Sequence, residues 1–245
     1  MFSAFRFLAL TAMTGLFLTT TPVAQAAEMD KTRVEQIVEQ YIMDHPEVIL
    51  NSVNEYQRTG MAKEQASAIA RNKRKIFQNS LSPVAGDPDG DITVVEFFDY
   101  NCGYCKRVVD DVNKLITSDN NVKVIFKEFP ILGPTSETAA RWALAAHNQN
   151  KYVEFHTAVM NASGRLDEDK LIGIANDLDL NIEKMRKDAQ SQQITDYIEE
   201  TRALAQEIGI TGTPGFIVED EVFPGAIEYD SMQDIIADKR AEKEG

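Results

Sequence analysis

Apolar and polar residues follow two different periods along this chain. Between residues 31 and 56 the apolar positions recur about every three to four residues, as in amphipathic helices. Pro46 interrupts the pattern, because the residue before a proline disfavours helix and a proline suits the first turn of a new one. The spacing therefore predicts two short helices, the second ending at Thr59-Gly60. Their apolar residues are Val34, Ile37, Val38, Tyr41, Ile42, Val48, Ile49, Val53 and Tyr56.

Residues 61–77 break this pattern, because they carry few large apolar side chains. They are rich in Ala, Lys, Glu, Gln and Arg, which are good helix formers. The segment is therefore predicted to be a solvated helix or a stiff linker. Prolines, glycines and aspartates then cluster over residues 82–90 and mark turns. We expect a helical segment over 27–60, a linker over 61–85 and a compact domain over 86–245.

Two stretches of the expected domain have the composition of buried strands. Ile92–Phe98 and 122–129 are dominated by apolar, β-branched and aromatic residues. Between them, apolar residues from Val108 to Ile116 recur at helical spacing. A right-handed crossover through that helix would place the second strand parallel to the first and beside it.

After the second predicted strand, the order of helical and strand patterns changes. From about residue 135 to 208 only helical patterns occur, whereas Gly215–Val218 and Glu221–Phe223 have the form of a hairpin. Residues 231–240 close the chain with a helix. The predicted class is therefore α/β, in the order β-α-β, inserted helices, β-β-α, preceded by an N-terminal helical segment.

Composition and charge limit the kinds of partner that this protein can bind. The chain has 245 residues and 43% hydrophobic content, enough for one well-packed domain with an appendage. Its formal net charge is -14, which argues against nucleic acid or an anionic membrane surface as a partner.

The first 26 residues have the layout of a signal peptide. Arg6 is the only charge before an apolar run from Phe7 to Leu18, and Ala24-Gln25-Ala26 supplies a small-x-small cleavage site. The alternative is an uncleaved membrane anchor, but threonines interrupt the run and about 18 apolar residues are needed to span a bilayer. We expect a protein exported to the periplasm, soluble and cleaved near Ala26.

The candidate chemistry lies where the first predicted strand gives way to a helix. Cys102 and Cys105, the only two cysteines, occupy that junction. The unpaired N–H groups and positive dipole end of a helix favour a thiolate at Cys102, and Lys106 and Arg107 act in the same direction. The spacing therefore predicts a redox dithiol with Cys102 as the exposed nucleophile and the more buried Cys105 as the resolving thiol.

The two cysteines are also compatible with other roles. A structural disulfide across this four-residue loop would stabilise the fold by only about 2 kcal/mol. Two thiolates could also bind Cu(I), which is the alternative function, whereas the scattered His45, His147 and His156 make zinc a poor fit. A passive binding module with an incidental disulfide is a third class. The redox reaction needs no cofactor.

Glu96 is an acid within the apolar strand that precedes the cysteines. Two interpretations stay open for it. Its carboxylate could relay the proton of Cys105, or it could be a strand-end carboxylate that pairs with a lysine such as Lys127.

Several motifs together resemble the thioredoxin fold with the helical insertion of the DsbA-like family. They are Val95-Glu96-Phe97-Phe98 leading to Cys102-Gly103-Tyr104-Cys105, Phe129-Pro130-Ile131-Leu132-Gly133, Ile210-Thr211-Gly212-Thr213-Pro214 and Pro224-Gly225-Ala226. The resemblance covers about residues 92–240. It implies a thiol:disulfide oxidoreductase in which Pro214 is a cis proline against the cysteines, and Thr213, Pro214 and Tyr104 contact substrate.

Further resemblances concern particular groups of disulfide-exchange proteins. Gly103-Tyr104 and Thr213 are similar to the residues at those places in the disulfide isomerase DsbC. The paired N-terminal helices resemble the stalk of trimeric ScsC-type proteins, which are also associated with copper tolerance. These resemblances imply a homo-oligomer, most simply a trimer, that acts on exported proteins with cysteines and exchanges electrons with a membrane thiol reductase or oxidase.

Overall fold

The computed structural model describes residues 30–244, which fall into two compact units that divide between Val53 and Asn54. The predicted signal peptide, residues 1–26, lies outside the described residues. Within residues 30–244, no helix is both long enough and apolar enough to cross a membrane.

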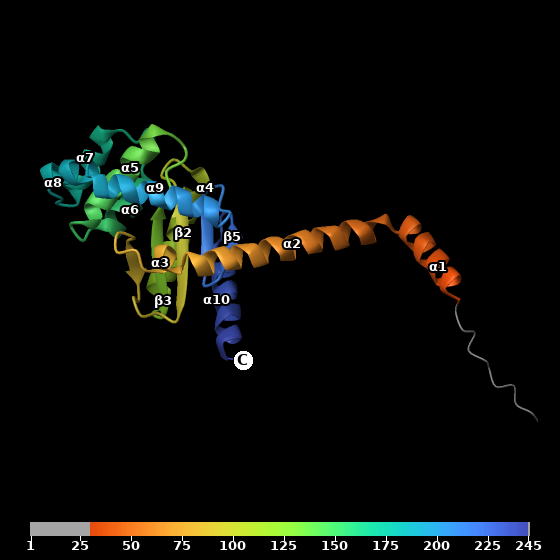
Figure 1. Cartoon of the computed structure of the whole chain (residues 1–245). Coiled ribbons are helices and arrows are strands. Elements are labelled where there is room, and N and C mark those ends of the chain that lie inside the picture. Colours follow the sequence, from red (N-terminus) through yellow and green to blue (C-terminus); the bar gives the residue numbers. More distant parts are fainter. Residues whose placement is uncertain (1–29, 245) are drawn as a thin grey trace, which may run out of the picture. The chain divides into compact units, whose positions relative to one another are not determined.

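The N-terminal helices begin and break largely as predicted. Helix α1 spans Lys31–Asp44 and is capped by Asp30, whose side chain accepts from the Thr32 amide at 3.2 Å. Helix α2 begins at Pro46 and continues to Arg71 (Figure 1). The predicted helix end at Thr59-Gly60 is therefore wrong. One glycine costs a helix only about 1 kcal/mol, and the residues around Gly60 are good helix formers.

A five-stranded mixed sheet forms the centre of the larger unit, in the order β1-β3-β2-β4-β5. Strands β2 and β3 are parallel neighbours, as the crossover rule predicted, and β4 and β5 form the predicted hairpin. The strands are β1 Val84–Gly86, β2 Ile92–Phe98, β3 Val122–Glu128, β4 Gly215–Val218 and β5 Glu221–Pro224.

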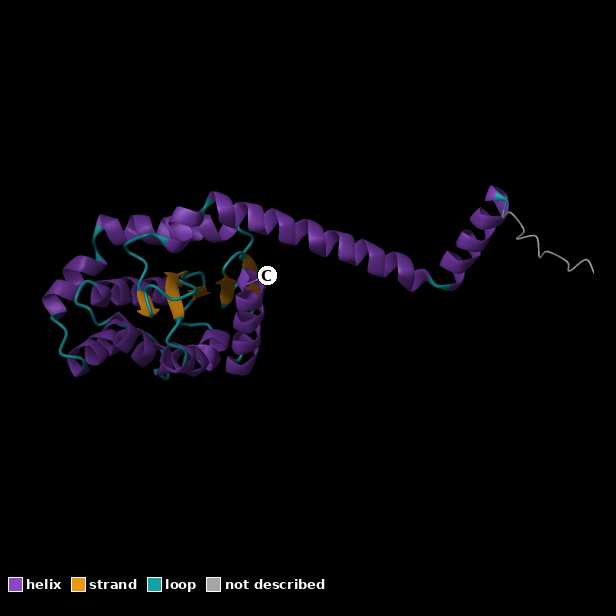
Figure 2. Ribbon diagram, turned by 90° about the horizontal axis from the view of Figure 1, so that it is seen from below, coloured by secondary structure: helices purple, strands orange, loops and turns teal. Residues whose placement is uncertain are grey.

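Helices cover both faces of this sheet, and Figure 2 shows the strands between two helical layers. The predicted helical insertion over residues 135–208 consists of the five helices α5 to α9. The helices of this unit after α2 are α3 Lys73–Phe77, α4 Gly103–Ser118, α5 Pro134–His147, α6 Tyr152–Asn161, α7 Glu168–Asp177, α8 Ile182–Ala189, α9 Gln192–Glu207 and α10 Tyr229–Glu244.

The alternation of side chains along β2 divides the core into two parts. Val94 and Phe98 point to the larger cluster, which includes α4 and most of the inserted helices. Val95 and Phe97 point to the smaller cluster, which includes the end of α2 and α9. Because successive strand residues face opposite sides, Glu96 lies on the α4 side with Val94 and Phe98.

The predicted linker over 61–85 contributes to both the core and the sheet. Ala68, Ile69 and Ile76 are buried in the smaller cluster, so this segment is not a fully solvated helix. Strand β1, which was not predicted, pairs antiparallel with β3. Three residues are too few to show an alternating pattern, and the pairing partner lies far along the chain.

Candidate active site

Cys102 is the N-cap residue of α4, where the sequence placed it. The Cys105 amide donates to the Cys102 Sγ atom at 3.4 Å, and both cysteines are free thiols. This contact joins the sulfur to a helix N–H that has no backbone partner. Cys102 is only 5% exposed and Cys105 is fully buried. Cys102 is thus the more exposed of the two, as predicted, although it is less exposed than expected.

The loop before β4 covers the cysteine pair. Cys102 Sγ donates to the Thr213 carbonyl oxygen at 3.2 Å, and the Thr213–Pro214 peptide bond is cis, as the resemblance implied. Tyr104 is 60% exposed on the same surface. Tyr104, Thr213 and Pro214 line one surface hollow of about 930 Å³. The structure therefore brings the three predicted substrate-contact residues together beside Cys102.

The two cations that follow the cysteines have partners of their own. The Lys106 ammonium group donates to the Ala162 carbonyl at 2.8 Å, and burial lowers the pKa of Lys106. The Arg107 guanidinium lies 4.4 Å from the centre of the Tyr104 ring. The Cys102 sulfur thus contacts the Cys105 amide and the Thr213 carbonyl, whereas the Lys106 and Arg107 side chains contact other groups.

Glu96 is buried on the same side of the sheet as Cys105. Burial raises the pKa of Glu96 to about 8. Burial also raises the pKa of the Cys105 thiol far above its usual range, and the charge of Glu96 acts in the same direction. A carboxylate near a thiol that holds its proton so tightly can accept that proton when Cys105 attacks.

The alternative pairing of Glu96 with Lys127 is wrong. Phe97, and not Glu96, lies opposite Lys127 in the ladder between β2 and β3, so the two side chains leave opposite faces of the sheet. The Lys127 ammonium donates to the Lys75 carbonyl at 2.6 Å and to Ser82 Oγ at 2.7 Å. Burial lowers the pKa of Lys127 to about 7.

The model of the DSBA-like thioredoxin domain family matches residues 93–237, which is more than half of the chain. The chain belongs to this family. The fold and the cysteine pair are thus those of a DsbA-like thiol-disulfide oxidoreductase.

Solved structures agree with this assignment. A thioredoxin-like oxidoreductase from Silicibacter pomeroyi DSS-3 is 44% identical, has a TM-score of 0.67 and covers 69% of this chain and 98% of its own. The thiol-disulfide exchange protein alpha-DsbA2 from Wolbachia pipientis is 28% identical, with a TM-score of 0.68 and coverage of 72% and 96%. Proteus mirabilis ScsC in a transitional conformation is 25% identical, with a TM-score of 0.68 and coverage of 86% and 97%.

Some curated relatives are much longer proteins. Na(+)/H(+) antiporter NhaA 1 of Salinispora arenicola is 28% identical over 151 residues, which are 61% of this chain but only 23% of the antiporter. The shared part is therefore a small fraction of the antiporter's length.

Asp99 organises the loops of this DsbA-like site, and the sequence analysis did not identify it. Its Oδ1 atom accepts from the Asn101 amide and Ser136 Oγ, both at 2.7 Å. Its Oδ2 atom accepts from the amides of Ile131 and Leu132 at 2.8 and 2.9 Å. One buried carboxylate thus fixes the segment before Cys102 against the loop after β3. The Asp that directly follows the buried strand was the available signal.

A buried polar cluster lies behind the same loop. Glu128 Oε1 accepts from the Tyr100 hydroxyl at 3.0 Å and the Tyr152 hydroxyl at 2.7 Å. The Tyr100 hydroxyl also lies 3.2 Å from His156 Nδ1, and burial lowers the pKa of His156 to about 3. His156 is therefore a neutral partner in this cluster. Across residues 30–244 no group of three or more His, Cys, Asp or Glu side chains is placed to hold a metal ion.

We predict that Glu96→Gln slows the attack of Cys105 on a mixed disulfide. A positioned general base contributes a factor of about 10² or more, and glutamine cannot accept the proton. The wild-type rate of this step should rise as pH increases through the Glu96 pKa of about 8, whereas the variant should lack that rise. Stopped-flow measurement of mixed-disulfide resolution across pH tests this, and Glu64→Gln, on the exposed surface of α2, is the control.

The same substitution should raise stability at alkaline pH. The folded pKa of Glu96 is raised to about 8 from 4.5, so folding favours the protonated acid. The contribution of protonated Glu96 to the stability of the folded protein is complete below pH 4.5. This contribution is lost as pH rises and is fully lost above pH 8. The pKa difference corresponds to roughly 5 kcal/mol. Urea unfolding at pH 5 and pH 9 should show that Glu96→Gln gains stability over wild type only at pH 9; an equal difference at both values would contradict the assignment.

Proposed function

We propose that this protein catalyses disulfide isomerisation and reduction in exported proteins through Cys102 and Cys105. Cys102 attacks a disulfide of the substrate, and a mixed disulfide forms while one substrate cysteine leaves as a thiolate. Cys105 then attacks the Cys102 sulfur and releases the substrate, or a substrate thiol attacks instead and forms a new pairing. The observation that carries the proposal is the Cys102 sulfur at a helix N-terminus, 3.2 Å from the Thr213 carbonyl.

The different environments of the two sulfurs support different roles for them. Cys102 is the cysteine with any exposed surface, and its sulfur contacts Thr213, which lines the hollow together with Tyr104 and Pro214. Cys105 is fully buried, so substrate must meet Cys102 first. We propose Glu96 as the group that accepts the Cys105 proton, and Tyr104, Thr213 and Pro214 as substrate contacts.

Self-association would suit isomerisation better than simple dithiol oxidation. The stripe residues of α1 and early α2 are largely exposed: Val34, Ile37, Val38, Tyr41, Val48, Ile49 and Val53 are each 38–54% accessible. Because exposed apolar stripes of this kind favour association, we propose a homo-oligomer. The resemblance of these helices to a trimeric stalk favours a trimer. Several active sites held together raise their effective concentration around one misfolded chain.

The periplasm is the proposed location, because it is an oxidising compartment in which disulfides form and persist. One of the similar solved structures is that of a periplasmic thioredoxin-like protein from Salmonella enterica serovar Typhimurium, which is 26% identical to this chain. A membrane thiol reductase would then keep the cysteines reduced for isomerisation, and a membrane oxidase would favour disulfide formation. Cu(I) binding by Cys102 and Cys105 remains the alternative prediction.

A pair of assays tests the proposed activity. Reactivation of a protein with scrambled disulfides measures isomerisation, and oxidation of a dithiol peptide measures disulfide formation. We expect the reduced protein to reactivate the scrambled protein faster than glutathione at the same thiol concentration. Dithiol oxidation without reactivation would identify an oxidase instead, and an inactive protein that holds Cu(I) would favour the copper alternative.

A further inference from the structure

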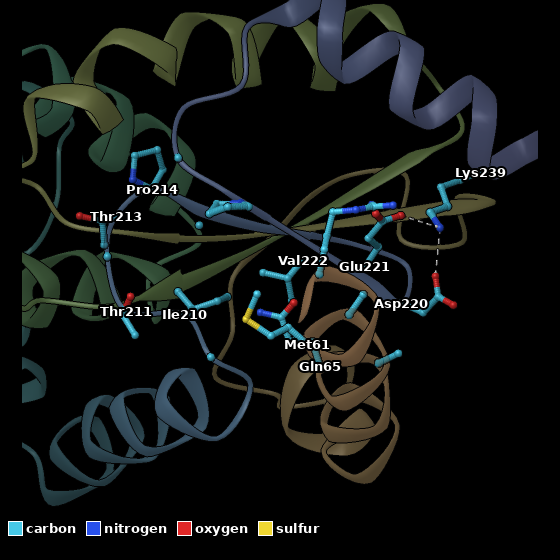
Figure 3. A pocket seen from close by; sticks show the side chains of 18 residues that line it. Met61, Gln65, Ile210, Thr211, Thr213, Pro214, Asp220, Glu221, Val222 and Lys239 are labelled. Atoms are coloured by element: carbon cyan, nitrogen blue, oxygen red, sulfur yellow. Dashed lines mark hydrogen bonds and ion pairs between the residues drawn. The ribbon is translucent and has the colours of Figure 1, made fainter. Parts of the chain in front are cut away.

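A second hollow, of about 720 Å³, meets the first one at Thr213, Pro214 and Gly225, which line both. Figure 3 shows Met61 and Gln65 of α2 facing Val222 of β5 across it, with the loop from Ile210 to Pro214 at one end. We name it the α2–β5 groove. Besides these residues, its lining comprises Arg58, Ala62, Ala66, Gly209, Gly215, Asp220, Glu221, Pro224 and Lys239.

The groove is apolar inside, and both cations at its rim are paired with carboxylates. Met61, Ile210 and Val222 supply apolar surface. Lys239 forms ion pairs with Asp220 at 3.3 Å and Glu221 at 3.1 Å, and Arg58 pairs with Glu55 at 2.8 Å. Because these rim cations are already neutralised, the groove has no charge to offer a phosphate or carboxylate. It suits an uncharged, apolar occupant.

Strand β5 adds backbone groups that an extended chain can use. It pairs only with β4, and no further strand of the described sheet lies beside it. In an antiparallel hairpin closed by the two residues Glu219-Asp220, Val218 and Glu221 form the hydrogen-bonded pair and the next pair does not. The N–H and C=O of Val222 therefore face away from β4. An extended peptide can bond to such a free edge by strand addition.

The groove continues from the reacting sulfur. Cys102 Sγ lies 3.2 Å from the carbonyl of Thr213, which lines the groove, so a substrate cysteine joined to Cys102 lies at its end. The chain that flanks that cysteine must leave along the surface next to Thr213 and Pro214. Helix α2, which supplies one wall, lies outside the family match at residues 93–237.

We propose that the α2–β5 groove binds an extended, uncharged and apolar segment of the substrate polypeptide, next to the cysteine joined to Cys102. The inference rests on the proposed function, because it is thiol exchange at Cys102 that brings the segment there. The substrate class is then an unfolded or misfolded chain, since a folded protein buries its apolar segments and offers no free strand.

Ala62→Glu and Met61→Glu place a carboxylate in the groove, and Ala70→Glu is the matched control. Ala62, Met61 and Ala70 are all exposed on α2, but Ala70 does not line the groove.

Two probes distinguish binding in the groove from the thiol exchange reaction itself. One is an uncharged apolar peptide whose central cysteine carries a disulfide-linked glutathione, and the other is glutathione disulfide alone. In each case the Cys102 thiolate displaces a glutathione thiolate, and Cys105 then displaces the second thiolate, leaving the protein oxidised.

We expect both groove variants of the full-length protein to react with the peptide at least about fivefold more slowly than wild type, as for loss of a contact at the centre of an interface. Their rates with glutathione disulfide, and both rates of Ala70→Glu, should match wild type. An undiminished peptide rate, or an equal loss with both probes, would overturn the inference. A changed mass in the groove variants alone would assign the groove to a second copy of this chain and overturn it as well. Failure of the wild type with both probes would instead count against the proposed function.

Discussion

Cys105→Ser should accumulate covalent complexes with cysteine-containing substrates, whereas Cys102→Ser should accumulate almost none. In the first variant Cys102 can still attack, but no buried thiol remains to release the mixed disulfide. In the second the nucleophile is lost, and we expect turnover to fall by at least about 10³-fold, because a serine hydroxyl cannot form a disulfide. Non-reducing electrophoresis after mixing with a reduced and reoxidising substrate measures the complexes.

The burial of Cys105 is the reason why we expect the two single variants to trap different amounts of complex. Cys105 is fully buried and burial raises the pKa of its thiol, so it is a poor replacement nucleophile when Cys102 is absent. The double variant Cys102→Ser with Cys105→Ser controls for noncovalent association. Equal trapping by the two single variants would contradict the assignment of Cys102 as the attacking thiol.

The position of the cysteines was predictable because it depends on local sequence. A buried strand at Ile92–Phe98 followed by helical spacing leaves one place for Cys102, and that place is a helix N-cap. The hairpin of β4 and β5 is likewise a local feature. The closeness of Pro214 to Cys102 was not evident from either pattern, because Cys102 and Thr213 are 111 positions apart in the sequence. It came from the resemblance to the family.

What the sequence did not show depends on contacts between distant segments. Asp99 reaches Ser136 across 37 positions, and Glu128 meets Tyr100 and Tyr152 only in the folded core. The alternation of β3 could have placed Glu128 on the α4 side and Lys127 on the other, which would have removed the pairing of Lys127 with Glu96. Burial of Ala68 and Ile69 was hidden because small and polar residues surround them in a good helix-forming segment.

The burial of Ala68, Ile69 and Ile76 also determines how self-association must be tested. Removing everything before the first predicted strand would delete Ala68, Ile69 and Ile76 from the core and β1 from the sheet. A loss of activity would then report damage to the fold. Point substitutions on the exposed stripe of α1 avoid this problem, since α1 has no buried residue.

We predict that Val38→Glu combined with Ile42→Glu converts the protein to a monomer and removes its isomerase activity while leaving dithiol oxidation intact. Val38 and Ile42 lie together in an apolar hollow of α1, and carboxylates there would repel one another across an interface between copies. Without the oligomer, a substrate released from one site is no longer held near another, so reactivation of a scrambled protein should fall about 10²-fold, at the low end of avidity effects. Oxidation of a dithiol peptide needs a single active site and should not change.

Gln36→Glu, on the polar side of the same helix, is the matched control and should keep both the oligomer and the isomerase activity. Light scattering gives the mass of each variant, and the two assays are run on the same samples. A wild-type protein that is already monomeric would contradict the proposed association directly. If the double variant is monomeric but still isomerises at the wild-type rate, the wild-type protein forms an oligomer that isomerisation does not need. Isomerisation would then be a property of the single domain around Cys102.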